Sequence, residues 1–354
     1  MYRKQYKNQN IMKKMNVIKC LALSSIFTAS LMSCENDNDD KTNASLKTFL
    51  FASNNSNGNI TTYDVSNMSM VTSKSFLTAS TAADGVYYDS EDDLVVQASR
   101  SNLSLEGFSN LSLSMTGANI SVGISGSADM KSPRELAVKD DFYVVADNAD
   151  VDGDASTPDG KLFIYTKSGS SFMLRNVITT DFKLWGITFD GDDLYAVVDA
   201  TNQLAVYKNF LSNTSNTTLS ATKKIAIEGI VRTHGLTYDA MSDTMIMTDI
   251  AAASNTQDDG AFHVIENFTS KFNNTANGAT LAASQQTRIA GSATLLGNPV
   301  DVAYDSYTKT VFIAEAGNGG GRILAFKDYT NGGNISPVLN NDLASASSVY
   351  LSKY

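Results

Sequence analysis

An acidic loop between two apolar runs could bind a metal ion. Residues 147–160 read DNADVDGDASTPDG and contain five Asp and one Asn. Calcium takes about six to eight oxygen ligands, and short side chains that alternate around a glycine turn can supply them. The candidate ligands are Asn148, Asp150, Asp152, Asp154 and Asp159. The sequence predicts either a structural calcium site or a solvated turn without an ion. It does not predict a catalytic metal, because such a loop surrounds the ion with protein ligands.

Carboxylates also recur where apolar segments end. Asp147, Asp199, Asp249 and Glu315 each close such a segment, at intervals of 52, 50 and 66 residues. In one interpretation each carboxylate accepts hydrogen bonds from backbone N–H groups of the following turn. In the alternative, the four form a ring of metal ligands. The first interpretation is favoured, because a structural role that repeats with the fold explains a repeated residue.

These carboxylates belong to a repeat of about fifty residues, which must position them. In each unit an apolar anchor, often followed by an aromatic residue and Asp, precedes a turn and two further apolar segments. The clearest copy, GITFDGDDLYAVVDATNQLAVY, spans residues 186–207. The anchors are Val86, Leu136, Ile187, Leu236, Val302 and Val349, at intervals of 50, 51, 49, 66 and 47 residues. The long interval predicts an insertion within residues 267–296.

The repeat predicts an all-β fold, a β-propeller built from four-stranded antiparallel blades. Residues 35–354 show no convincing helical periodicity. The segments FYVVA, LYAVV and VFIAE are continuously apolar, as expected for sheets buried on both faces. The first unit lacks an anchor segment, and the last segment, SSVYLS, is an anchor alone. Joined, they complete a sixth blade, so the C-terminal strand closes the ring; a seventh blade inside the insertion is the alternative.

The residues two positions before each anchor should crown one mouth of the central channel. They are Asp84, Arg134, Trp185, His234, Val300 and Ser347. Unlike the repeated carboxylates, they differ from unit to unit, as ligand contacts can. Asp84, Arg134, Trp185 and His234 could hold a polar ligand, with Arg134 binding a carboxylate and Trp185 stacking on a sugar ring. The alternative is a set of solvated rim residues, with Trp185 filling space between blades.

The pattern of anchor, aromatic residue, Asp, strand and turn resembles the NHL and YWTD class of six-bladed propellers, over residues 46–354. The segment YAVVDATNQLAVY is similar to the NHL consensus. The resemblance implies a protein-, glycan- or small-molecule-binding module or scaffold. It also implies an alternative, a metal-dependent, lactonase-like hydrolase whose available channel residues are Asp84, Glu135, His234 and Asp301. No nucleophile, phosphate-loop or paired-His zinc motif occurs in the chain.

The N-terminal residues read as a targeting segment. Residues 1–33 contain a basic start and the apolar stretch Leu21–Leu31, and Met12 is a better start than Met1. The sequence LMSC before and including Cys34 resembles a bacterial lipobox, which predicts a signal peptide and a lipidated Cys34. An ordinary signal peptide is the alternative. Residues 34–45 should form an acidic flexible tether, and they are either a surface-export signal or a spacer.

Charge completes the prediction. Six of the 27 basic residues and none of the 37 acidic residues lie in residues 1–33, so the remainder carries a net charge of −16. A body this acidic repels phosphate backbones, which argues against nucleic acid as a partner. From the targeting segment we expect an outer-membrane lipoprotein of the bacterial cell envelope, held by a lipid anchor. From the repeat and its resemblance we expect a propeller that binds a ligand or a protein.

Overall fold

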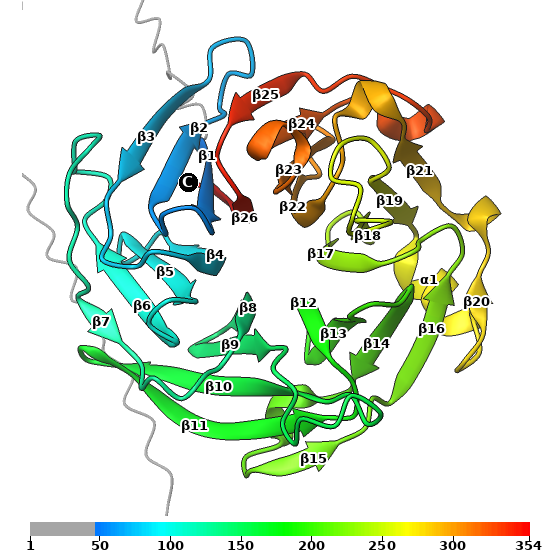
Figure 1. The fold of residues 1–354 in the computed structure, drawn as a ribbon, viewed down its shortest axis with the longest axis horizontal. Helices are drawn as coiled ribbons and strands as arrows, with labels where there is room; N and C mark the ends of the chain where they lie inside the picture. The colour runs from blue at the N-terminus through cyan, green and yellow to red at the C-terminus, as the bar shows by residue number, and fades with distance from the viewer. Residues whose placement is uncertain (1–46) are drawn as a thin grey trace, which may run out of the picture. The chain divides into compact units, whose positions relative to one another are not determined.

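Antiparallel strands dominate residues 47–354, the part of the chain that the computed structural model describes. The predicted signal peptide, Cys34 and the tether lie outside these residues. Each of the six anchors lies in a strand that faces the centre of the molecule (Figure 1). These inner strands are β4 (Ala83–Asp89), β8 (Pro133–Lys139), β12 (Leu184–Asp190), β17 (Thr233–Asp239), β22 (Pro299–Asp305) and β26 (Ala346–Lys353).

Each inner strand pairs with a second strand, and two further strands follow outward. The second strands are β5 (Leu94–Ser99), β9 (Phe142–Asp147), β13 (Asp193–Val198), β18 (Thr244–Asp249), β23 (Thr310–Glu315) and β1 (Thr48–Asn54). The third strands are β6 (Ser104–Ser109), β10 (Gly160–Ser168), β14 (Gln203–Tyr207), β19 (Ala261–Glu266), β24 (Arg322–Phe326) and β2 (Ile60–Asp64). The outer strands are β7 (Ile124–Ser125), β11 (Ser171–Thr180), β16 (Lys223–Ile227), β21 (Thr287–Ala290), β25 (Leu339–Asp342) and β3 (Thr72–Phe76).

The inner strands meet in a closed ring, in the order β26, β4, β8, β12, β17, β22 and back to β26. The sheets radiate from this ring, which is the arrangement of a β-propeller (Figure 1). Five hydrogen-bonded sheets result, because the sheets that begin with β4 and β8 are joined where β7 pairs with β11. As predicted, the first and last strands of residues 47–354 share one sheet: β26 pairs with β1, from Thr48 opposite Lys353 to Asn54 opposite Ala346.

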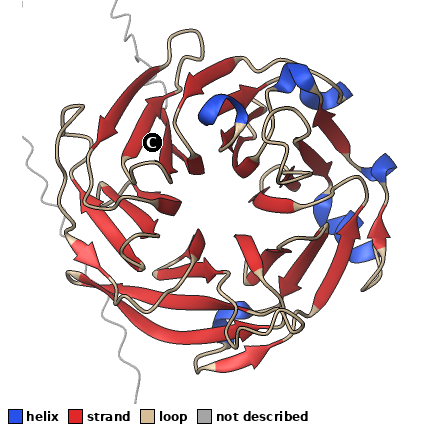
Figure 2. Ribbon diagram, viewed as in Figure 1, coloured by secondary structure: helices blue, strands red, loops and turns tan. Residues whose placement is uncertain are grey.

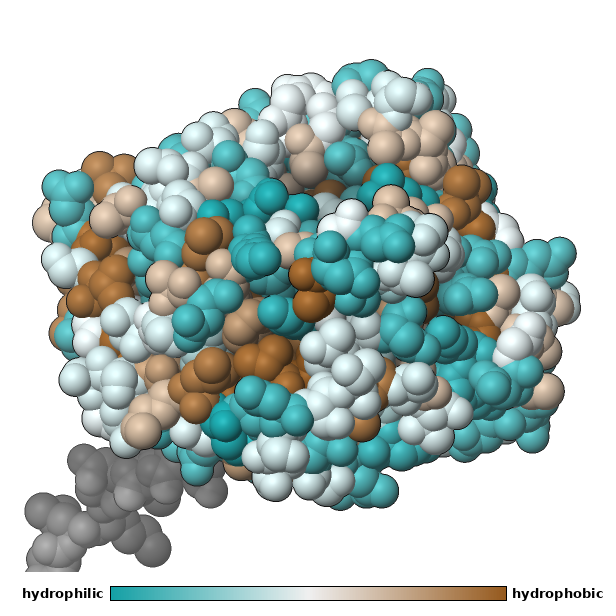
Figure 3. All heavy atoms as spheres, turned by 60° about the horizontal axis from the view of Figure 1, so that its bottom comes forward, coloured by the Kyte–Doolittle hydropathy of each residue, from teal (hydrophilic) through white to brown (hydrophobic). Residues whose placement is uncertain are grey.

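Burial on both sheet faces explains the continuous apolar runs. All six residues of β5 and of β18 are buried. One core cluster joins Val144 and Ile164 of one sheet to Ile187 and Ala196 of the next. Consistent with this burial, the face shown in Figure 3 exposes hydrophobic residues only in small groups among hydrophilic ones. The core of each interface is therefore shared by two neighbouring sheets.

The insertion does not form a sheet of its own. It supplies β21 to the sheet of β17 and β20 (Thr280–Leu281) to the edge of β16. It also contains α1 (Phe268–Asn274), a helix that the sequence did not predict, because seven residues are too few to show a helical period. Phe268 and Phe272 of α1 pack against Tyr195. A short strand, β15 (Thr217–Leu219), pairs with β11, and the few helical segments lie in the connections (Figure 2).

The inner strands approach one another closely at the residue before each anchor. A Cβ atom at Gly85 would lie 2.6 Å from the backbone nitrogen of Leu136, and one at Gly235 would lie 2.5 Å from Cα of Asp301. Real side chains do not tolerate such distances, so glycine allows the ring to close at these positions. Within residues 47–354, no helix has the length and apolar character needed to span a membrane.

Candidate functional site

Three of the repeated carboxylates hold the backbone of their own sheet. The Asp249 carboxylate accepts hydrogen bonds from the backbone N–H groups of Val231 (3.1 Å) and Arg232 (2.9 Å), before β17, and of Ala251 (2.9 Å), after β18. Asp147 and Glu315 do the same at their own blades. The predicted turn-capping role is present, and it extends to the loop that precedes the inner strand.

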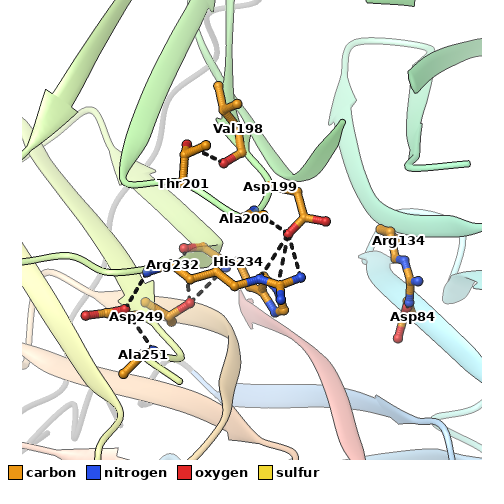
Figure 4. A network of polar contacts seen from close by, with 12 residues as sticks. Asp84, Arg134, Val198, Asp199, Ala200, Thr201, Arg232, His234, Asp249 and Ala251 are labelled. Atoms are coloured by element: carbon orange, nitrogen blue, oxygen red, sulfur yellow. Dashed lines mark hydrogen bonds and ion pairs between the residues drawn. The ribbon is translucent and has the colours of Figure 1, made fainter. Parts of the chain in front are cut away.

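Asp199 departs from this pattern. Its carboxylate accepts one backbone hydrogen bond, from Ala200 at 2.6 Å, and otherwise faces side chains (Figure 4). Nη2 of Arg232 lies 2.9 Å and Nε2 of His234 lies 3.5 Å from its Oδ1 atom. Burial raises the pKa of Asp199, but the contacts with His234 and Arg232 outweigh this and lower the value to about 2. Asp199 is therefore an ionised group directed toward the channel mouth.

The structure stacks Arg134, Trp185 and His234, three of the predicted mouth residues, on one another. The rings of Trp185 and His234 are nearly parallel, with an interplanar angle of 6° and centroids 3.8 Å apart. The guanidinium carbon of Arg134 lies 4.0 Å from the centroid of the Trp185 ring. Both faces of the indole are thus covered, because two groups at these distances cannot share one face. In this conformation His234 and Arg134 cover the indole, and the stacking of Trp185 on a sugar ring stays a prediction.

Asp84 continues the chain of contacts on the other side of Arg134. Its Oδ2 atom lies 3.4 Å from Nη1 of Arg134 and 3.6 Å from Nε of Arg100. Its Oδ1 atom accepts a hydrogen bond from Asn55 at 2.7 Å. Burial raises the pKa of Asp84, and the two arginines oppose that shift. Asp84 and His234 are buried rather than solvated, so the predicted alternative of an exposed rim does not describe them.

We call the connected residues the mouth cluster: Asp84, Arg100, Arg134, Trp185, Asp199, Arg232 and His234. The cluster has more hydrogen-bond donors than acceptors. Each guanidinium carries five N–H donors, yet within residues 47–354 Arg134 makes one side-chain hydrogen bond, to Asp84 at 3.4 Å, and its buried Nε atom has no partner. Both ring nitrogens of His234 are buried without a hydrogen bond among the same residues. Burial lowers the pKa of His234, which keeps the ring neutral near pH 7.

Sequence reasoning found part of this cluster and missed the rest. Asn55 follows β1 and Arg100 follows β5, and Arg232 lies in the loop before β17. None of the three lies two residues before an anchor, which is the position from which the sequence predicted mouth residues. The repeat predicts that Asp199, like Asp249, accepts hydrogen bonds from backbone N–H groups, whereas it mainly contacts the side chains of Arg232 and His234. The two remaining mouth positions do not join the cluster, since Val300 packs in the core and Ser347 hydrogen bonds to Ala83 at 2.5 Å.

Below the mouth, the channel contains a cavity of about 190 Å³ that is lined by all six inner strands. Glu135 and Asp301 both line it, and both residues are buried. Within residues 47–354, the channel brings no three metal-ligating His, Cys, Asp or Glu side chains together. The four residues available to a metal-dependent hydrolase lie in two places. Asp84 and His234 belong to the mouth cluster, whereas Glu135 and Asp301 line the cavity. This division does not favour the hydrolase alternative.

The acidic loop is the place where carboxylates do converge among the described residues. Ligand atoms of Asp150, Asp152 and Asp159 lie within 4.8 Å of one another, and Asp154 is not in this group. Nζ of Lys183 lies 3.4 Å from Asp150 and competes with a cation for that carboxylate. Asp150 and Asp152 also accept backbone hydrogen bonds within the loop, each at 2.8 Å. The loop geometry is compatible with both interpretations, an ion site and a solvated turn.

No family model and no curated protein matches the chain. Solved structures of similar fold do exist. A chain from the crystal structure of a nidogen/laminin complex is 13% identical over 86% of this chain and 98% of that chain, with a TM-score of 0.56. A candidate 6-phosphogluconolactonase of Bacteroides fragilis is 8% identical over 89% and 100%, with a TM-score of 0.56. Another from Bacteroides uniformis is 11% identical over 84% and 83%, with a TM-score of 0.53. At such low identity these likenesses support the propeller fold alone.

The different environments of Asp249 and Asp199 predict different effects on stability. Asp249→Ala should lower the free energy of unfolding by about 1.5–3 kcal/mol, because it leaves three backbone N–H groups without their charged acceptor. Asp199→Ala should cost less than Asp249→Ala, because it leaves a single backbone N–H group, that of Ala200, without its acceptor, and the partly exposed Arg232 can turn to solvent. Urea unfolding of both variants measures the difference. Equal losses would contradict the distinction drawn between the two carboxylates.

Proposed function

We propose that this protein is a binding module whose ligand site is the mouth cluster, and that the ligand presents an anionic group. The observation that carries the proposal is the surplus of buried and half-buried donors around Arg134. Three arginines and two aspartates give the cluster a net charge of +1 with His234 neutral, in a chain whose net charge is −10. A carboxylate or phosphate is the chemical group that satisfies guanidinium forks.

The architecture we propose for this module is a six-bladed propeller of the NHL or YWTD type. The closed ring of six inner strands supports this count, with the sheets of β4 and β8 taken as two blades. A propeller gathers side chains from several blades at one mouth. The nidogen structure, which was determined in a complex with laminin, is a propeller-like neighbour that engages a protein. A protein that bears an acidic group is thus one class of ligand, and a glycan or small acid is another.

The tryptophan of the cluster allows a direct binding test, because Trp185 is the single Trp of the chain. We expect a hexuronate or a hexose phosphate to change the intrinsic fluorescence, and the neutral hexose to leave it unchanged. Arg134→Gln should weaken the binding of the anionic probe roughly 10- to 100-fold, which corresponds to the loss of one charged hydrogen-bonding group. Fluorescence titration gives the dissociation constants.

Arg288→Gln is the matched control, because Arg288 is exposed on the outer strand β21. It should bind like the unmodified protein. Equal binding by the neutral hexose, or equal weakening by the two substitutions, would refute an anion site at Arg134.

We also propose that Cys34 is lipidated and anchors the protein to the outer membrane of a bacterial cell envelope. The LMSC sequence after a basic and apolar segment supports this, and the anchor would hold the propeller at the membrane through residues 34–45. Cys34→Ala should move the protein from the membrane fraction to the soluble fraction. Cys20→Ala, the other cysteine of the chain, should leave it in the membrane fraction. Membrane retention of Cys34→Ala would overturn the proposal.

A structural calcium ion in the acidic loop is the remaining proposal for this protein. The convergence of Asp150, Asp152 and Asp159 supports it; Asn148 and Asp154 are the further oxygen donors of the loop. Calcium at about 100 times its dissociation constant should stabilise the fold by about 2.7 kcal/mol. Asp152→Ala should abolish this thermal shift, and Asp342→Ala, an exposed carboxylate on β25, should retain it. A shift that survives Asp152→Ala would place calcium elsewhere.

A further inference from the structure

Two buried carboxyl groups face each other across the channel, immediately below the mouth cluster. Glu135 lies on β8 and Asp301 on β22, and in the ring of inner strands two other strands separate β8 from β22 on either side. The two strands are therefore opposite each other. Both residues occupy the position before an anchor, where Gly85, Gly186 and Gly235 stand on three other inner strands. The two residues line the cavity that all six inner strands surround.

Each carboxyl group is held by backbone or hydroxyl donors. Oε1 of Glu135 accepts a hydrogen bond from the backbone N–H of Leu136 at 2.8 Å. Oδ1 of Asp301 accepts one from Val302 at 2.7 Å. Oδ2 of Asp301 accepts two from β26, from the hydroxyl of Ser348 and the backbone N–H of Val349, each at 2.8 Å. These hydrogen bonds position the side chains, and both carboxyl groups line the same cavity.

No positive charge compensates the pair. Among the ion pairs of residues 47–354, none includes Glu135 or Asp301. The nearest ionisable group of β4 is Asp84, whose charge opposes ionisation of Glu135. Tyr87 of β4 and Tyr350 of β26 line the cavity below, and β12 contributes Thr188. Arg134 of β8 and His234 of β17 face Trp185 in the mouth cluster.

Ionisation of both carboxyl groups is strongly disfavoured, because each would be a buried charge opposite a like charge. A shared proton converts the repulsion into a hydrogen bond between them. We propose that Glu135 and Asp301 share a proton across the channel and form a proton-dependent bridge that ties β8 to β22. The bridge closes the channel between the mouth cluster and the cavity.

The bridge makes stability depend on pH. Burial and the neighbouring carboxylate raise the pKa of Glu135, and burial raises the pKa of Asp301 to about 6. The folded protein therefore holds protons that the unfolded chain releases at lower pH. A group of this kind stabilises the fold fully at acid pH, and its contribution is lost as the pH rises through the folded-state pKa. The shared proton leaves with the higher pKa of the pair, so the bridge should weaken as the pH rises through the raised pKa of Glu135.

Glu135→Gln tests the bridge, because the amide keeps an N–H donor toward Asp301 at every pH. We expect the melting temperature of the unmodified chain to fall between pH 5 and pH 9, and that of Glu135→Gln to fall less. The variant should be the more stable of the two at the upper end of this range. Glu266→Gln, the same change at an exposed position on β19, should follow the unmodified chain. Parallel curves for Glu135→Gln and the unmodified chain would overturn the proposal.

Infrared spectroscopy tests the shared proton directly. At pH 7 the unmodified chain should show a protonated-carboxyl stretch that Glu135→Gln lacks and Glu266→Gln retains. An unchanged band in Glu135→Gln would also overturn the bridge. Asp301→Asn provides the same two measurements if Glu135→Gln does not fold, since its amide oxygen can still accept a hydrogen bond from Val349.

Discussion

The close approach of the six inner strands is the constraint on which the rest of the molecule depends. Strands that converge on one axis leave little room for a side chain where they come nearest. Gly186 illustrates the limit, because a Cβ atom there would lie 2.5 Å from the carbonyl oxygen of His234 on the next strand. Glycine at three of the six positions brings backbones into contact. The other three positions hold Glu135, Asp301 and Ser348, which use the space that the glycines leave. The Ser348 hydroxyl donates a hydrogen bond to Asp301, and Glu135 lines the channel cavity.

The same constraint assembles the mouth cluster. One residue earlier along each strand, the ring is wide enough for side chains, but these are still forced into mutual contact. Arg134, Trp185 and His234 come from three successive inner strands and stack because their strands are held side by side. Desolvation follows from this crowding and lowers the pKa of His234, while the contacts with His234 and Arg232 lower the pKa of Asp199. The stacking, burial and pKa values of the mouth residues therefore depend on the close approach of the inner strands at the next residue along each strand.

Much of the fold could be predicted from the sequence, because a repeated backbone imposes a repeated pattern of residues. The anchors located the inner strands, and the final apolar segment indicated that β26 would pair with β1. The site was predicted less completely. Arg100 and Arg232 lie in connections whose lengths differ, so the repeat does not locate them. Arg100 reaches Asp84 and Arg232 reaches Asp199 only through the direction of their side chains. The meeting of Glu135 and Asp301 at one cavity depends on closure of the whole ring, and no local pattern in the sequence encodes it.

The contrast between Asp249 and Asp199 indicates which polar groups of this fold serve structure. Asp249 satisfies three backbone donors, so its burial is compensated by the sheet that it holds together. Asp199 occupies the equivalent position, yet it contacts a guanidinium and an imidazole, and the sheet folds with a single backbone bond to it. Buried ion pairs are often no more stabilising than apolar residues of the same volume. Stability alone thus gives no reason for the charges at the mouth, whereas recognition of an anionic ligand requires donors that the fold itself leaves unsatisfied.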